Sequence, residues 1–103
     1  MSRIEKLLEF IQTSGKDSFL QHALALEYIK IGKDEQAREL FNEILEREPG
    51  YVGSYYHLGK LLERLGDIDG ATKTYEKGIT EAQMAGDHHS RMELQGALDD
   101  IEE

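Results

Sequence analysis

Apolar residues recur at helical spacing along almost the whole of this 103-residue chain. Residues three or four positions apart share one face of a helix, so each run of this kind predicts an amphipathic helix. The runs predict six helices, over residues 3–13, 18–31, 34–48, 52–65, 68–85 and 87–101. The single proline, Pro49, falls between two of the runs, where it cannot interrupt a helix. We therefore expect an all-α protein.

Short polar signals predict how several of these helices begin. Ser2 and Glu5 have the spacing of a capping box, in which each side chain satisfies a free amide of the first turn. Ser18 and Gln21 repeat that spacing at the second helix. Asp34 is expected to be the N-cap of the third helix, because its carboxylate can accept a first-turn amide.

The chain also matches itself in chemical type at an offset of 34 residues. The matched pairs are Leu24 and Leu58, Ala25 and Gly59, Lys30 and Arg64, Gly32 and Gly66, Ala37 and Ala71, and Phe41 and Tyr75. A fixed period of this size is typical of stacked-repeat proteins, in which a single repeat cannot bury its apolar face alone. The small residues among these pairs are expected where two helices approach closely.

Two motifs carry a family resemblance. The second unit reads Tyr55-x-x-Leu58-Gly59-x-x-Leu62 and then Ala71-x-x-x-Tyr75, and the first reads Leu24-Ala25-x-x-Tyr28 and then Ala37-x-x-x-Phe41. Both units resemble tetratricopeptide repeats. Three positions depart from that pattern: Gln21 replaces a bulky aromatic residue, Gly78 a usual Ala, and Gln83 a common closing Pro.

The resemblance implies a right-handed α-solenoid of antiparallel helix pairs with a C-terminal capping helix. We expect one domain, with a half-repeat helix at 2–14, repeats at 18–51 and 52–85, and the capping helix at 86–103. Solenoids present a concave surface, and such surfaces usually bind other chains.

Charge and composition narrow the class of partner. Lys and Arg number 12 against 21 Asp and Glu, a net charge of −9 that argues against binding nucleic acid or an anionic membrane. No Cys is present, and no apolar run reaches the ~20 residues that span a bilayer. The N-terminus lacks the apolar core of a signal peptide. We expect a soluble, cytoplasmic protein.

By resemblance, the first helix of each unit lines the concave groove. The candidate peptide-binding residues are Phe19, His22, Leu26 and Lys30 in the first unit and Tyr56, His57, Lys60 and Arg64 in the second. Cations and His outnumber acids among the groove-facing positions, which favours an acidic peptide or a carboxylate as ligand. The alternative is that these are ordinary solvated residues of a helix surface.

Some members of this family grip the C-terminal carboxylate of heat-shock chaperones with Lys, Asn and Arg residues. His22, Leu26 and His57 stand where Lys and Asn would be expected. The resemblance therefore does not support that clamp.

The second helix is apolar nearly all round, with Phe19 and Leu26 outside its main stripe. Contact with neighbouring helices would explain this, since such a helix is normally buried on more than one side. The alternative is that Phe19, Leu26 and Ile29 form an exposed patch used for a peptide or for self-association. His89 and Glu93 share a helix face but offer too few ligands for a metal site.

We found no nucleophile with a matching base and no phosphate-binding glycine loop, so we expect no enzyme and no cofactor. The sequence favours a non-catalytic interaction module or scaffold that binds a peptide segment of another protein. The alternative is a self-associating unit such as a homodimer, or a fragment of a longer repeat protein.

Overall fold

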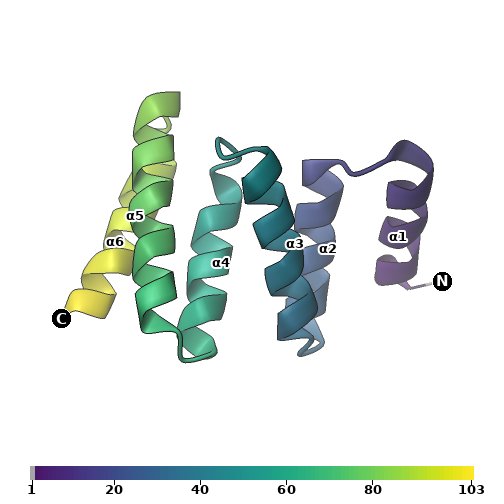
Figure 1. Ribbon diagram of the computed structural model, residues 1–103, viewed down its shortest axis with the longest axis horizontal. Helices are drawn as coiled ribbons and strands as arrows, with labels where there is room; N and C mark the ends of the chain where they lie inside the picture. Colours follow the sequence, from purple (N-terminus) through teal and green to yellow (C-terminus); the bar gives the residue numbers. More distant parts are fainter. Residues whose placement is uncertain (1) are drawn as a thin grey trace. The chain divides into compact units, whose positions relative to one another are not determined.

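The structure, a computed structural model, describes residues 2–103, which form six α-helices and no strand (Figure 1). The helices are α1 (Arg3–Ser14), α2 (Ser18–Lys30), α3 (Asp34–Arg47), α4 (Gly53–Arg64), α5 (Ile68–Ala85) and α6 (His88–Glu102). The all-α prediction is confirmed, and every predicted helix boundary lies within one residue of the observed one.

The helices form two compact units, and the chain passes from one to the other between Glu48 and Pro49. Unit 1 holds α1 to α3 and unit 2 holds α4 to α6. Within each unit consecutive helices run antiparallel and pack on one another, and α6 also contacts α4 (Figure 1). These antiparallel pairs are the elements of an α-solenoid.

The predicted N-cap of α1 is confirmed, whereas that of α2 is wrong. The Ser2 hydroxyl accepts a hydrogen bond from the Glu5 amide at 3.1 Å, as expected. At α2 the prediction is wrong, because the N-cap is Asp17, whose carboxylate accepts from the Leu20 amide at 3.0 Å. Ser18 is already the first helical residue.

Ser18 and Gln21 instead belong to a partly buried polar cluster that joins the start of α2 to the end of α3. The Arg47 guanidinium donates to the Ser18 hydroxyl at 2.8 Å and to the Gln21 side-chain oxygen at 2.6 Å. The Ser18 hydroxyl donates in turn to Glu48 at 2.8 Å. Gln21 is only 2% exposed, so this bond satisfies a polar group that would be costly to bury alone. The cluster accounts for Gln21 in place of a bulky aromatic residue.

The N-cap of α3 also differs from the prediction. Lys33 occupies that position and makes no side-chain capping bond, while Asp34 is the first helical residue. Asp34 there complements the positive end of the helix dipole instead of bonding a free amide as N-cap. In unit 2 the residue that matches Lys33 is Asp67, and its carboxylate does accept from the Gly70 amide, at 2.9 Å.

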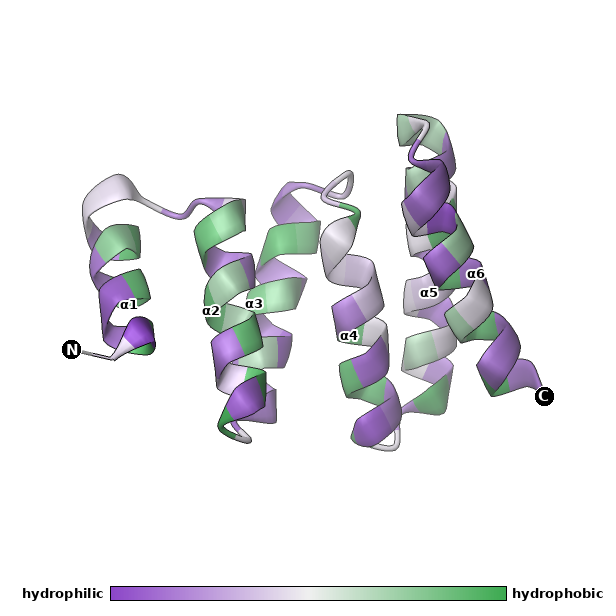
Figure 2. Ribbon diagram, turned by 180° about the vertical axis from the view of Figure 1, so that it is seen from behind, coloured by the Kyte–Doolittle hydropathy of each residue, from purple (hydrophilic) through white to green (hydrophobic). Residues whose placement is uncertain are grey.

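Glycine allows close helix packing in unit 2. A Cβ at Gly59 would lie 2.1 Å from the ring of Tyr75, so α4 and α5 meet there as the repeat pattern predicts. A Cβ at Gly78 would lie 2.7 Å from the Cβ of Tyr55, which accounts for glycine where the family usually has Ala. Apolar and polar stretches alternate along each helix, as one buried face requires (Figure 2).

Candidate functional site

The eight predicted binding residues lie on α2 of unit 1 and on α4 of unit 2. We call Phe19, His22, Leu26 and Lys30 the α2 face, and Tyr56, His57, Lys60 and Arg64 the α4 face.

Three residues of the α2 face, Phe19, Leu26 and Lys30, are spaced so that they share one side of the helix. Phe19 is 70% exposed, Leu26 is half-buried and Lys30 is exposed. An exposed Phe beside a second apolar side chain and a cation can accept an apolar group with a negative charge nearby.

His22, the fourth residue of this face, also packs within its own unit. Its ring meets the buried ring of Phe41 edge-on, with centroids 5.6 Å apart and an angle of 68° between the planes. This geometry is a favourable aromatic contact between α2 and α3. His22 therefore contributes to the packing of the helix pair as well as to the surface.

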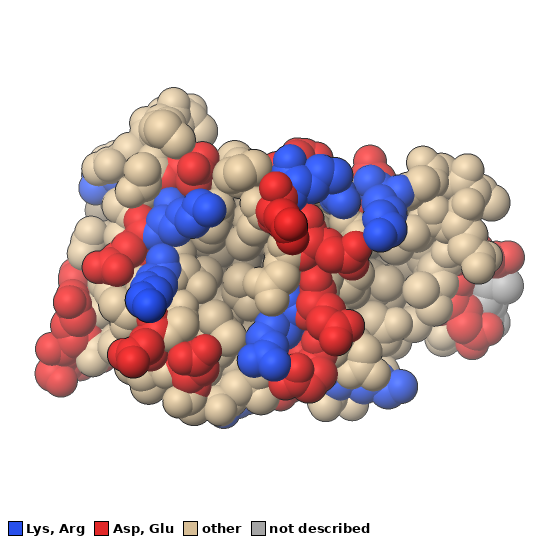
Figure 3. All heavy atoms as spheres, in the orientation of Figure 1, with Lys and Arg blue, Asp and Glu red and all other residues tan. Residues whose placement is uncertain are grey.

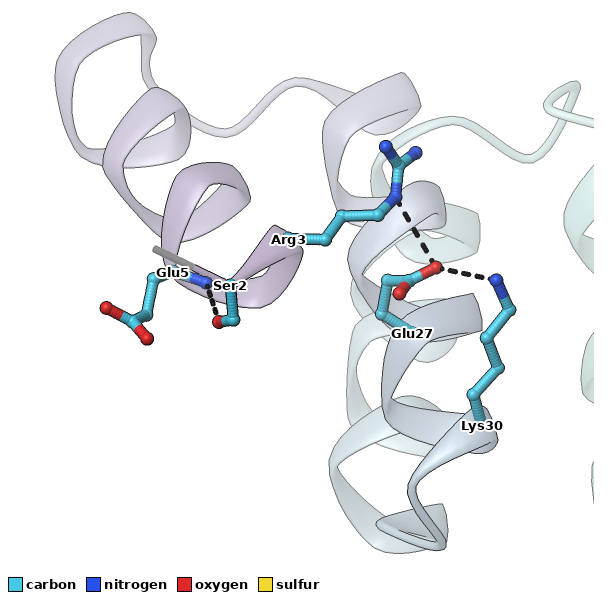
Figure 4. A network of polar contacts seen from close by, with 5 residues as sticks. All are labelled: Ser2, Arg3, Glu5, Glu27 and Lys30. Carbon is cyan, nitrogen blue, oxygen red and sulfur yellow. Dashed lines mark hydrogen bonds and ion pairs between the residues drawn. The ribbon is translucent and has the colours of Figure 1, made fainter.

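Two cations converge on one carboxylate at the α1–α2 contact (Figure 4). Lys30 Nζ lies 3.0 Å from Glu27 Oε2, and Arg3 Nε lies 3.4 Å from the same oxygen. The Glu27 side chain is 16% exposed, whereas those of Arg3 and Lys30 are 66% and 70% exposed. Glu27 therefore partly neutralises the α2 face. Sequence reasoning missed this pair, although the three-residue spacing from Glu27 to Lys30 is a recognisable signal.

The α4 face combines aromatic rings with cations. Tyr56, Lys60 and Arg64 are four residues apart and form one row along the helix. Lys60 Nζ lies 5.7 Å from the centroid of the Tyr56 ring, within the range of a cation–π contact. The ring of His57 meets that of Tyr56 edge-on at 5.7 Å. Arg64 is exposed at the end of the row.

One acid, Glu63, lies beside this row. Its Oε2 accepts a hydrogen bond from the Tyr75 hydroxyl at 2.5 Å and lies 3.7 Å from Lys60 Nζ. Burial, and then the bond to Glu63, raises the pKa of Tyr75 far above its usual range, so the hydroxyl remains a donor. Glu63 is therefore held mainly by α5 and only loosely by Lys60.

The pKa of His57 depends on burial and on the charge of Glu93 in α6. Burial lowers the pKa of His57 below its usual value of 6.5, and the charge of Glu93 opposes that shift. His57 is therefore mostly neutral at neutral pH. Glu93 Oε2 also lies 3.6 Å from His89 Nε2, on the helix face that the two residues were predicted to share. Within residues 2–103 no group of three His, Cys, Asp or Glu side chains could hold a metal ion.

Acidic and basic side chains are interleaved on the visible face of the protein, with no uniform basic field (Figure 3). The α4 face carries two cations, Lys60 and Arg64, in a protein of net charge −9. Over the described residues, none of the helices is long and apolar enough to cross a membrane.

The sequence model of the tetratricopeptide repeat matches residues 20–51 and 52–83. A TPR repeat-containing protein of Pseudomonas aeruginosa is 29% identical over 91 residues, which cover 88% of this chain and 87% of that protein.

Solved structures show the same similarity. The crystal structure of a tetratricopeptide repeat domain protein from Salinibacter ruber has a TM-score of 0.81 and 45% identity, over 84% of this chain and 97% of that chain. The solution structure of a protein from Bordetella parapertussis has a TM-score of 0.84 and 27% identity, over 98% of this chain and 88% of that chain.

Proposed function

Because the chain belongs to the tetratricopeptide repeat family, whose members mediate protein–protein interactions, we propose that it binds peptide segments of partner proteins at its α2 face and at its α4 face, each within its own unit. The family and the fold are typical of non-catalytic scaffolds. The observation that carries the proposal is the row of Tyr56, Lys60 and Arg64, which concentrates cations and an aromatic ring on one side of α4.

The α4 face favours an acidic segment. The Lys60 side chain is 40% exposed, and its contact with Glu63 is 3.7 Å long, which exceeds the usual length of a charge-assisted hydrogen bond. A carboxylate of the partner can therefore approach Lys60 more closely than Glu63 does. The Tyr56 ring beneath Lys60 restricts where the ammonium group can lie.

The α2 face favours apolar side chains in a partner. Phe19 and Leu26 share one side of α2, and covering a large apolar side chain such as Phe19 contributes on the order of 1–2 kcal/mol. Lys30 adds a positive charge that can attract an acidic residue of the partner. Its ion pair with Glu27 weakens that attraction. A partner of the α2 face therefore offers apolar residues, and a partner of the α4 face offers acidic ones. Because the helices are already packed, little ordering cost falls on the protein's side.

A binding experiment with a simple probe tests this proposal. The probe is a fluorescein-labelled peptide of repeated Leu-Glu-Glu triplets, and a Leu-Lys-Lys peptide of equal length is the control ligand. We expect fluorescence anisotropy to show binding of the acidic peptide alone. Lys60→Glu with Arg64→Glu should weaken that binding about tenfold, as expected for two charge reversals at an exposed site.

The chain offers a matched control for this double variant. Lys73→Glu with Lys77→Glu makes the same change in net charge at two exposed positions of α5, with the same four-residue spacing. If the site is local, the α5 variant should bind the acidic peptide nearly as tightly as the wild type. Equal losses in the two double variants would show that only net charge matters, and the α4 site would be rejected.

A further inference from the structure

Four residues around the α4 face differ as a group from their counterparts in the first repeat. The counterparts 34 residues apart are Ala25 and Gly59, Leu26 and Lys60, Ile29 and Glu63, and Phe41 and Tyr75. In the first repeat all four are apolar. In the second repeat the set gains a cation, an anion and a hydroxyl, and loses a methyl group at Gly59.

The structure connects the four residues of the second repeat in a chain of contacts. Gly59 leaves room for the Tyr75 ring, since a Cβ there would lie 2.1 Å from it. Glu63 lies one turn further along α4, where its Oε2 accepts from the Tyr75 hydroxyl at 2.5 Å. The same oxygen faces Lys60 Nζ at 3.7 Å. A buried residue of α5 therefore contacts the carboxylate nearest to a proposed binding residue.

The two contacts of this oxygen are unequal. A hydroxyl donating to a carboxylate at 2.5 Å is a short, strong hydrogen bond, whereas 3.7 Å exceeds the 2.7–2.9 Å typical of an ammonium–carboxylate hydrogen bond. By comparison, Lys30 approaches Glu27 to 3.0 Å in unit 1. The Tyr75 hydroxyl is therefore the closer of the two partners of this oxygen.

We propose that Tyr75 is a positioning residue for partner binding, which holds Glu63 away from Lys60 and so leaves the Lys60 ammonium available to a carboxylate of the partner. The binding part of this inference rests on the proposed function. The competing explanation is that Glu63 only satisfies the buried Tyr75 hydroxyl. In that case, removing the hydroxyl changes stability but not the behaviour of Lys60.

A measurement without any partner separates these explanations. Acylation of Lys60 by an amine-reactive ester is followed by mass spectrometry, with the exposed Lys77 of the same chain as internal reference. In Tyr75→Phe, Glu63 is released to approach Lys60 more closely than 3.7 Å, and we expect acylation of Lys60 to slow by about two- to fivefold, as for a strengthened surface ion pair. An unchanged rate would overturn the proposal.

The double variant provides the decisive control. Tyr75→Phe with Glu63→Gln has no carboxylate to release, so its Lys60 should react at the same rate as in Glu63→Gln alone. If the double variant remained as slow as Tyr75→Phe, the loss would come from altered packing, and the proposal would be rejected. Phe41 fills the matching core position of unit 1, so the ring without its hydroxyl suits this packing. Should Tyr75→Phe fail to fold, Glu63→Gln alone still tests the proposal: because Tyr75 already holds Glu63 away from Lys60 in the wild type, the Lys60 rate should change by less than about twofold, and a larger rise would overturn the proposal.

Binding of the labelled Leu-Glu-Glu peptide then tests the consequence for function. Tyr75→Phe should weaken binding by about two- to fivefold, and the double variant should match Glu63→Gln. If the wild type does not bind this peptide, the proposed function fails while the acylation rates still decide the role of Tyr75. If the wild type binds and Tyr75→Phe binds equally well, Tyr75 does not position the site.

Discussion

Gly59 and Gly78 show how far the packing of unit 2 depends on residues without a side chain. Gly59 faces the Tyr75 ring, and Gly78 faces Tyr55 and Leu94. A Cβ at Gly59 would lie 2.1 Å from a ring carbon, closer than real contacts allow. Tyr75 is fully buried, so its ring has little room to move aside.

Gly59→Ala should therefore destabilise the protein, even though Ala is a better helix former than Gly. The added methyl group must displace the Tyr75 ring, and overpacking of this kind costs about 1–3 kcal/mol. Chemical denaturation followed by circular dichroism measures this free energy of unfolding.

Gly96 supplies the matched control, because it also lies inside a helix. A Cβ there would have no neighbour within 4 Å. Gly96→Ala should stabilise the protein by about 0.5–1 kcal/mol through helix propensity alone. If Gly59→Ala behaved like Gly96→Ala, the close approach of α4 and α5 would be wrong.

At the scale of single residues, the sequence indicated which side chains lie on the α2 and α4 faces but not what holds them. The spacing of Glu27 and Lys30 is local and could have been recognised. The contacts of Arg3 with Glu27 and of Tyr75 with Glu63 join different helices. Such contacts depend on the angle and register of packing, which a single sequence does not give.

Among the helices, α6 begins with a cap that titrates. The Asp87 carboxylate accepts from the Ser90 amide at 3.0 Å and from the Ser90 hydroxyl at 2.7 Å. These two bonds lower the pKa of Asp87 below its usual value of 3.8. The carboxylate form is therefore favoured by folding, and protonation weakens the start of α6.

This shift predicts a pH dependence of known sign. Because the pKa of Asp87 is lower in the folded state, its contribution to stability is full above the unfolded-state pKa, about 4, and is lost as the pH falls through the folded-state value. Asp87→Asn keeps an oxygen that can cap the helix but cannot titrate.

Thermal unfolding of the wild type and of Asp87→Asn between neutral and strongly acidic pH measures this effect. The difference in melting temperature should be constant above about pH 5 and should shrink below about pH 4. The reason is that residue 87 loses a negative charge in the wild type but carries none in the variant. The other carboxylates titrate in both proteins and cancel in the comparison. A difference that is independent of pH would mean that the charge of Asp87 does not stabilise α6.

Helix positions were predictable because the signals are local, whereas two of the caps were not. Apolar spacing together with glycine and proline placed every boundary within one residue. Ser18 was predicted to help open α2, but Arg47 and Glu48 of the same unit bind its hydroxyl, and Asp17 takes the N-cap position. At the start of α2, hydrogen bonds to α3 and to Glu48 thus determine the role of Ser18 in place of the predicted capping motif.

For the molecule as a whole, the balance between charge and exposed apolar residues decides whether copies associate. The net charge of −9 makes two copies repel each other at low salt. Against this, exposed large apolar residues occur on several helices, among them Phe10 on α1, Phe19 on α2 and Met92 on α6. Exposed apolar side chains are common on monomeric proteins and do not by themselves indicate an interface.

We therefore expect a monomer whose mass in sedimentation equilibrium does not change with protein concentration, even when salt screens the net charge. A mass that rose with concentration in the wild type would support self-association. If Leu26→Asp then abolished the rise while Phe10→Asp on α1 did not, the α2 face would bind a second copy of the chain. Self-association would replace peptide binding as the function of that face. The opposite response of the two variants would instead place the contact on α1.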